Sequence, residues 1–142
     1  MAVTKDKTID IADFFTTTKE REGVWYEAKV QGVPTGLMFK VLGYASDENV
    51  LSAEAYKKEH ELAEKETDVA KKAEMEREAV CNRLTAIVTD LKAVEGKNIV
   101  LNGEPLTYSK EIVKKIFWES IDIRTDVFNA SFDSTNFMTK KF

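Results

Sequence analysis

The residues with the most versatile chemistry in this sequence are a single histidine and a single cysteine. His60 and Cys81 are twenty-one residues apart, so a zinc site would need several carboxylates to complete its ligand set. His60 falls in a run of charged residues, which is typical of a solvated helix surface. Cys81 falls in a more apolar stretch, where a buried thiol is expected rather than a nucleophile. Neither residue indicates catalysis or metal binding.

Other catalytic patterns are equally sparse. Gly32 and Gly36 belong to a turn cluster and are not followed by Gly-Lys-Ser/Thr, so a phosphate-binding loop is not indicated. The sequence also lacks a Gly-x-Ser-x-Gly nucleophile motif. Glu119, Asp126 and Asp133 could share a site, but nothing in their spacing requires it. We therefore expect a protein that is not an enzyme, with no catalytic, cofactor-binding or metal-binding residues and no cofactor.

Composition narrows the classes of partner. The chain has 142 residues and a net charge of −4, and its lysines and arginines are dispersed among acidic residues, so no nucleic-acid surface is expected. No apolar run approaches the roughly 20 residues of a membrane span, so no membrane partner is expected either. The N-terminus lacks a signal-peptide pattern and the lone cysteine gives no disulfide framework, which predicts a reducing, intracellular compartment.

The expected fold is α+β and mostly helical, in a single domain over residues 1–142. It is organised around one long charged helix over residues 46–91, which contains no Gly or Pro and many strong helix formers. Ser46 is its expected N-cap. The alternative is a break near Thr67-Asp68, which would give two antiparallel helices. The other parts are an N-terminal arm (1–22), a β-hairpin (23–45), a C-terminal helical part (92–133) and a tail (134–142).

Within the long helix, the apolar positions form only a narrow stripe in the charged first half. Leu62, Val69 and Ala73 follow one another at spacings of seven and four, which is wide enough for one partner helix but too thin for a globular core. From Ala79 onward the apolar positions become dense enough for core packing. We expect the stripe to contact a partner helix or a second copy of the chain.

The flanking segments carry strand, turn and cap signals. Two β-rich runs surround the Gly/Pro-containing cluster at 31–36, which predicts a hairpin whose loop is too long for a tight two-residue turn. Asn102-Gly103 favours a type I′ turn, in a short turn segment ahead of two C-terminal helices. Ser109 and Ser120 are the expected N-caps of those helices. The adjacent Phe14 and Phe15 would cover the edge of a core or contact a partner.

Aromatic residues are concentrated in the last third of the chain, more than helices of this size need for core packing. The surplus would be available to grip an apolar partner, because aromatic side chains are frequent anchors in interfaces. The alternative is that all of them belong to the core. The residues that we expect to supply core and groove are Phe117, Trp118, Phe128 and Phe132.

The order of these parts resembles the small tail assembly chaperones of long-tailed bacteriophages, and the similarity covers Gly23 to Phe132. Its most specific segment is Gly-Glu-Pro-Leu-Thr-Tyr-Ser, within Asn102 to Glu111. The other matching features are Gly-Val-Trp at 23–25, the Ser-started charged helix, the apolar segment Leu84 to Leu91 and the closing Asn-Ala-Ser-Phe at 129–132.

This resemblance implies a non-enzymatic helper in the host cytoplasm during infection. Such chaperones bind the apolar, helix-rich tape-measure protein and recruit tail-tube subunits to it, and they are usually absent from the finished particle. Association with a second copy, as a homo-oligomer, is also open. The alternative is a virion structural protein, a tail, neck or capsid-associated subunit that remains in the particle.

Overall fold

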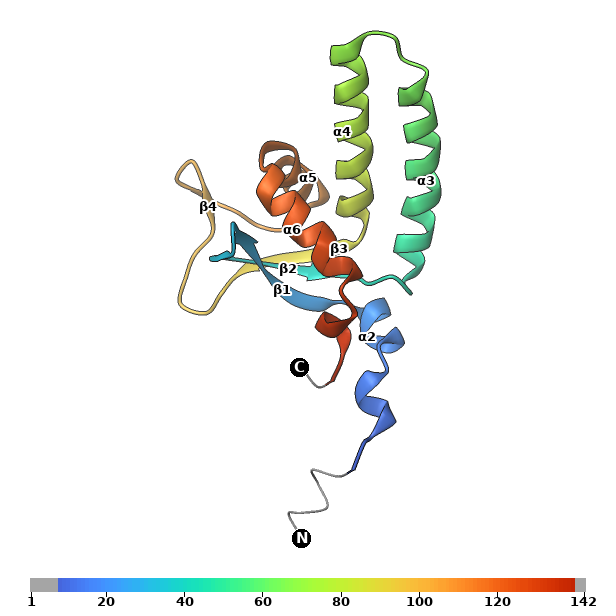
Figure 1. The fold of residues 1–142 in the computed structure, drawn as a ribbon. Coiled ribbons are helices and arrows are strands. Elements are labelled where there is room, and N and C mark those ends of the chain that lie inside the picture. Colours follow the sequence, from blue (N-terminus) through green and yellow to red (C-terminus); the bar gives the residue numbers. More distant parts are fainter. Residues whose placement is uncertain (1–7, 140–142) are drawn as a thin grey trace.

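The computed structural model describes residues 8–139 and confirms an α+β, mostly helical fold. A three-stranded antiparallel sheet and two C-terminal helices form a body, from which a helical hairpin projects (Figure 1). Residues 1–7 of the expected arm and 140–142 of the expected tail lie outside the described residues. The elements are η1 (Ile11–Phe14), α2 (Thr17–Glu22), β1 (Val24–Val30), β2 (Val33–Val41), α3 (Asp47–Glu64), α4 (Val69–Ala86), β3 (Val88–Ala93), β4 (Val100–Leu101), β5 (Glu104–Pro105), α5 (Lys110–Glu119), α6 (Ile121–Phe132) and η2 (Ser134–Phe137).

The expected continuous helix over residues 46–91 is wrong. Ser46 does cap its start, since the Ser46 hydroxyl accepts a hydrogen bond from the backbone N–H of Asn49. The helix ends at Glu64, however, and α4 returns antiparallel to α3 after a short turn, as in the alternative with a break near Thr67-Asp68. The Asp68 carboxylate accepts from the N–H of Lys71 and thereby caps the second helix.

The C-terminal end of the expected long helix is a strand. α4 ends at Ala86, and Val88–Ala93 forms β3, which pairs with the central strand β2. The segment Ile87-Val88-Thr89 is β-branched, which favours a pleated strand over a helix. Val88 and Leu91 are buried in this strand, so they join the core from the sheet rather than from a helix.

The β-hairpin is confirmed, but its expected long loop is wrong. β1 and β2 are joined by the two residues Gln31 and Gly32, whose φ angles of 51° and 80° match a type I′ turn. Pro34 is tolerated within β2 because it pairs only with β1, before β3 joins the other edge at Leu37.

The C-terminal part largely follows expectation. The hydroxyls of Ser109 and Ser120 cap α5 and α6, and Asn102 and Gly103 have the positive φ angles of the expected turn, between the short strands β4 and β5. Within the expected tail, η2 forms and brings Phe137 into a buried position. At the other end of the chain, Phe15 is exposed, so it does not cover the core edge.

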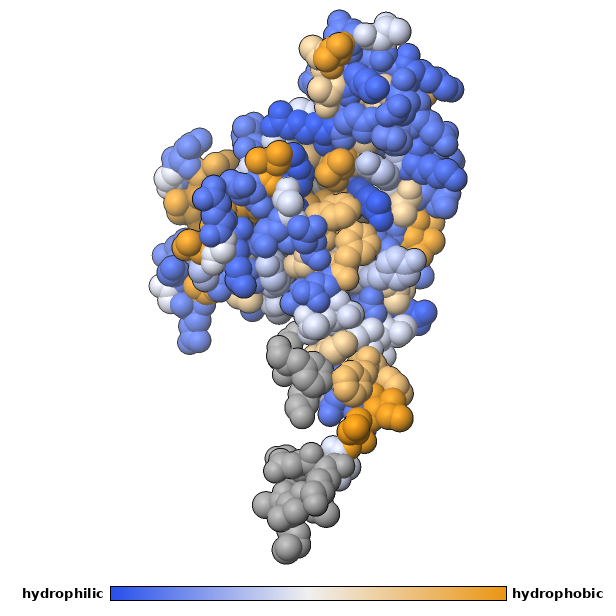
Figure 2. Space-filling view, viewed as in Figure 1, coloured by the Kyte–Doolittle hydropathy of each residue, from blue (hydrophilic) through white to orange (hydrophobic). Residues whose placement is uncertain are grey.

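The core lies between the sheet and helices α4, α5 and α6. Its centre is the contact between Phe39 on β2 and Phe117 on α5, whose ring centroids are 5.2 Å apart and whose side chains are fully buried. The other core residues include Ala28, Val41, Leu84, Val88, Val113 and Val127. Figure 2 shows apolar side chains at the base of the molecule, over the N-terminal segment, whereas the helical hairpin is mostly hydrophilic.

A hydrogen bond from Tyr26 fastens β1 to α6. The Tyr26 hydroxyl donates to the Asp126 carboxylate at 2.9 Å, and Asp126 also accepts from the N–H of Lys29. Burial, this hydrogen bond and nearby negative charge raise the pKa of Tyr26 to about 12.

This raised pKa predicts an alkaline loss of stability. Because the folded state holds the phenol proton more tightly than the unfolded chain, the stabilisation is complete below pH 10 and is lost as the pH rises towards 12. Tyr26→Phe should reduce the free energy of unfolding by about 1 kcal/mol at neutral pH, and this advantage of the parent protein should shrink and be lost as the pH rises from 10 towards 12. Urea unfolding across this range, with the exposed Tyr44→Phe as control, measures it. A difference that is constant with pH would contradict the assignment.

Candidate partner-binding surface

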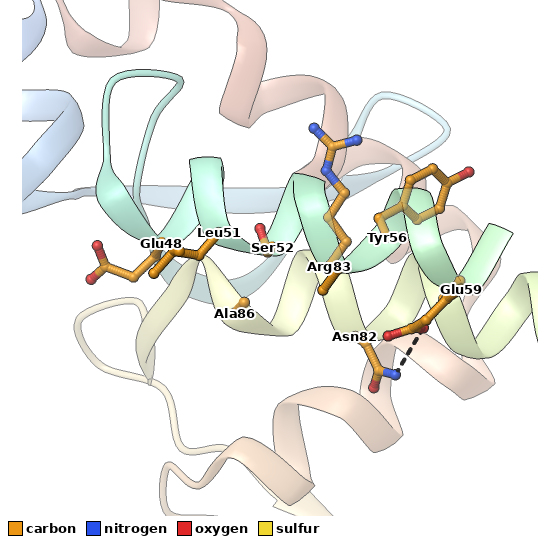
Figure 3. Close-up of a pocket in the computed structure, with 10 residues that line it drawn as sticks. Glu48, Leu51, Ser52, Tyr56, Glu59, Asn82, Arg83 and Ala86 are labelled. Carbon is orange, nitrogen blue, oxygen red and sulfur yellow. Dashed lines mark hydrogen bonds between the residues drawn. The ribbon is translucent and has the colours of Figure 1, made fainter. Parts of the chain in front are cut away.

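Two shallow grooves run along the base of the helical hairpin and meet at shared side chains. The first, of about 370 Å³, lies between α3 and α4 (Figure 3), and the second, of about 230 Å³, lies between α4 and α6. Tyr56 and Arg83 line both grooves. In the first groove, Glu48 and Leu51 lie towards one end and Glu59 towards the other. Small residues from both helices, including Ala55, Ala79 and Ala86, complete its lining.

Arg83 is held among three aromatic rings. Its guanidinium carbon lies 5.5 Å from the ring centroids of Tyr56, Phe128 and Phe132, within the range of cation–π attraction. The ion pairs formed among residues 8–139 do not include Arg83. The arrangement therefore presents a positive charge, positioned by apolar rings, between two grooves.

Exposed apolar side chains extend the surface around Arg83. Phe128 packs on Phe132 with ring centroids 5.1 Å apart, and Phe132 meets Tyr44 edge to face at 6.4 Å. Tyr44 and Leu51 are each 70% exposed and Phe132 is 40% exposed. Contiguous apolar surface rimmed by polar groups is typical of a protein interaction site. We call these residues, Tyr44, Leu51, Tyr56, Arg83, Phe128 and Phe132, the aromatic surface.

The structure divides the four expected aromatic residues between core and surface. Phe117 is fully buried against Phe39, so it supplies core. Trp118 is half-buried, with the guanidinium of Arg77 4.3 Å above its ring. Phe128 and Phe132 belong to the aromatic surface, where Phe128 lines the second groove and Phe132 packs against Phe128.

The expected stripe is exposed but is not continuous. Leu62 lies near the end of α3, and Val69 and Ala73 lie in the first turns of α4, on the other side of the turn. Leu62 is 60% exposed and Val69 83% exposed, and Ala73 is also exposed. These residues therefore lie near the tip of the hairpin, away from the two grooves, and their role in binding a partner stays a prediction.

Tyr44, Leu51, Tyr56 and Arg83 were not indicated by sequence patterns. Tyr56 and Arg83 meet only because α4 folds back along α3, and both reach α6 only because α6 packs beside α4. The one available signal in the sequence was the position of Tyr44, an aromatic residue between a predicted strand and the predicted helix N-cap Ser46, where a side chain can stay exposed. Without the position of the turn, the sequence could not bring these residues together.

The side chains that could do chemistry are engaged in structural contacts. Cys81 is fully buried, and this burial raises the pKa of its thiol, so the protonated, unreactive form prevails at neutral pH. Asp126 is held by Tyr26 and Lys29. His60 lies at the surface as expected, with its side chain 43% exposed, and its Nδ1 lies 2.9 Å from Glu76, a hydrogen bond that raises the pKa of His60. Together with Glu64 and Glu76, it forms the one group among residues 8–139 that could hold a metal ion.

Among residues 8–139, no helix combines the length and apolar character that crossing a membrane requires. Comparison with protein-family models, with curated proteins and with solved structures finds no match to this chain.

Proposed function

We propose that this protein is a non-enzymatic assembly factor that binds an apolar helical segment of another polypeptide at the aromatic surface. The observation that carries the proposal is the environment of Arg83. Its guanidinium lies among three aromatic rings between the two grooves, and the ion pairs formed among residues 8–139 do not include it. A helix that lies in such a groove offers apolar side chains at spacings of three and four, and a carboxylate on it would pair with Arg83.

The resemblance to tail assembly chaperones supports a specific partner. The bound segment would belong to a phage tape-measure protein, and tail-tube subunits would join the complex in the host cytoplasm. The exposed rings of the aromatic surface suit this task, because aromatic anchors bind apolar helices without requiring one fixed sequence. The mixed charges of the helical hairpin keep the remaining surface hydrated.

Co-expression with the tape-measure protein encoded in the same phage genome tests this function. We expect the two chains to co-elute from a sizing column as a complex of defined mass, and mass spectrometry of purified particles to lack the protein. If the protein is present in particles at the level of the tail tube, it is a virion structural subunit and the chaperone proposal fails. If it associates only with itself, the partner is a second copy.

A further inference from the structure

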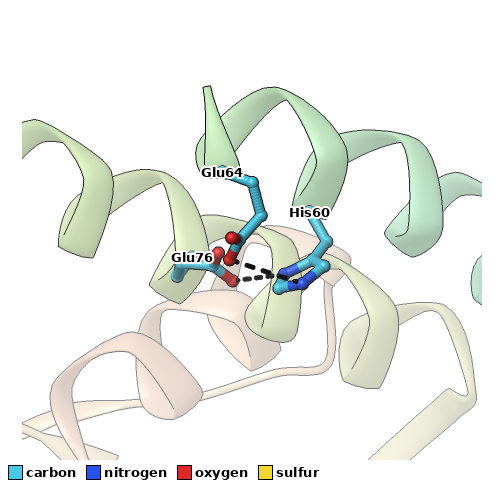
Figure 4. Close-up of side chains that lie close together, drawn as sticks. All are labelled: His60, Glu64 and Glu76. Atoms are coloured by element: carbon cyan, nitrogen blue, oxygen red, sulfur yellow. Dashed lines mark hydrogen bonds and ion pairs between the residues drawn. The ribbon is translucent and has the colours of Figure 1, made fainter. Parts of the chain in front are cut away.

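Three side chains with metal-binding chemistry converge on the side of the helical hairpin, near its turn. His60 and Glu64 are one turn apart on α3, and Glu76 faces them from α4 (Figure 4). Nδ1 of His60 is 2.9 Å from a Glu76 carboxylate oxygen, and Nε2 is 3.6 Å from a Glu64 oxygen. One donor atom from each residue lies within 4.8 Å of the other two.

These separations suit a small transition-metal ion. Two ligand atoms bound to zinc at about 2.0–2.1 Å with tetrahedral angles lie about 3.3 Å apart. The Nδ1 of His60 lies 2.9 Å from Glu76, close to that value, whereas Glu64 lies 3.6 Å from the other ring nitrogen, Nε2. Because one donor atom from each residue lies within 4.8 Å of the other two, rotation of the Glu64 side chain towards Nδ1 would bring both carboxylates to one ring nitrogen. A donor set of one imidazole and two carboxylates favours zinc over magnesium and calcium, which prefer oxygen ligands alone.

We propose that His60, Glu64 and Glu76 form a binding site for a divalent transition-metal ion of the zinc class, which links α3 to α4. One nitrogen and two oxygens would bind the ion, and water would fill the remaining position. The Tyr56 ring stacks on the His60 ring, with centroids 5.8 Å apart and planes 13° apart, and so limits the rotation of the imidazole.

One charged neighbour competes with the metal. The Lys72 ammonium lies 3.9 Å from the second oxygen of Glu64, so this lysine balances the carboxylate charge in the metal-free protein. Its side chain is partly exposed and can swing into solvent when an ion binds. Sequence patterns did not indicate this site, because Glu76 approaches His60 only through the turn that reverses the chain.

Isothermal titration of the full chain with zinc chloride, after removal of metals by a chelator, tests the site. We expect one zinc ion per chain and no binding of magnesium chloride. His60→Ala and Glu76→Gln should each weaken zinc binding about tenfold or more. Glu74→Gln, a change of the same kind at an exposed position two residues away on α4, is the matched control and should bind like the parent.

Thermal unfolding provides a second measurement, since an ion that bridges two helices binds only the folded protein. Zinc should raise the Tm of the parent and of Glu74→Gln but not of Glu76→Gln, whose folding is checked by circular dichroism without metal. Zinc binding that is equally tight in the parent, His60→Ala and Glu76→Gln would overturn the proposal. Equal losses in Glu74→Gln and Glu76→Gln would overturn it as well, because binding would then depend on overall charge alone.

Discussion

Replacing Phe117 by alanine should lower the free energy of unfolding by about 3–5 kcal/mol. Phe117 is fully buried and its ring lies 5.2 Å from that of Phe39, so the substitution opens a cavity where α5 meets the central strand of the sheet. Neighbouring backbone elements cannot close this cavity, because β2 is held by hydrogen bonds to strands on both sides. Urea unfolding followed by circular dichroism measures the loss.

Two further variants show whether burial is the cause. Phe117→Leu keeps most of the apolar volume and should lose less stability than Phe117→Ala. Phe132→Ala removes the same side chain from a 40% exposed position and should cost about 1 kcal/mol or less. Equal losses for Phe117→Ala and Phe132→Ala would show that the core does not centre on the contact between α5 and the sheet.

Local signals with a direct physical cause were predicted well. Ser46, Ser109 and Ser120 were expected as N-caps, and in each case the hydroxyl accepts a hydrogen bond from a first-turn backbone N–H. Asn102-Gly103 was expected as a turn because both residues tolerate positive φ angles. These features depend on residues within a few positions of one another, which the sequence shows directly.

The break in the long helix depends on a competition that helix propensity does not describe. Both Asp68 and Glu66 favour the turn: Asp68 caps α4, while the Glu66 carboxylate accepts from the N–H of Asp68. These hydrogen bonds from backbone N–H groups to side chains replace the helical backbone hydrogen bonds that are lost at the turn. The reversal also lets small residues pack between the helices, since Ala63 and Ala79 are buried there.

The strand β3 was missed because its apolar spacing fits both structures. Leu84, Ile87 and Leu91 recur at three and four residues, which is the spacing of a helix face. In the structure, an irregularity in the pairing of β2 with β3 lets Lys40 pair with Asp90 while the next residue, Val41, pairs with Val88. Val88 and Leu91 can therefore both be buried despite being three residues apart.

The candidate surface was predictable only in part. The surplus of C-terminal aromatic residues pointed to Phe128 and Phe132, because the number of aromatic side chains in this part of the chain exceeds what a small core can hold. The same argument could not separate these from Phe117, whose burial depends on which face α5 turns to the sheet. Arg83 and Tyr56 come together only because the chain reverses between α3 and α4. In a continuous helix, Tyr56 would lie far from Arg83 and from α6.

The proposed function predicts that the aromatic surface, and not the tip of the hairpin, binds the partner helix. The double variant Arg83→Ala/Phe132→Ala should weaken binding of a tape-measure helix about 30-fold or more, since removing a central arginine or aromatic anchor typically costs about 2 kcal/mol. Arg83 lies over the ring of Phe132, so the two side chains act together. Fluorescence anisotropy with a labelled tape-measure peptide measures the affinity.

The second surface is the tip of the hairpin. Leu62→Asp/Val69→Asp should leave the fold intact, because both side chains are exposed, and should weaken binding less than the aromatic-surface variant. These two residues lie on different helices and line neither groove, so they offer a partner helix no continuous stripe. Arg77→Ala, which removes an arginine stacked on Trp118 outside both grooves, is the matched control. A larger loss at the tip than at the aromatic surface would move the binding site to the turn, and the two grooves would then have to be explained as packing features of the hairpin base.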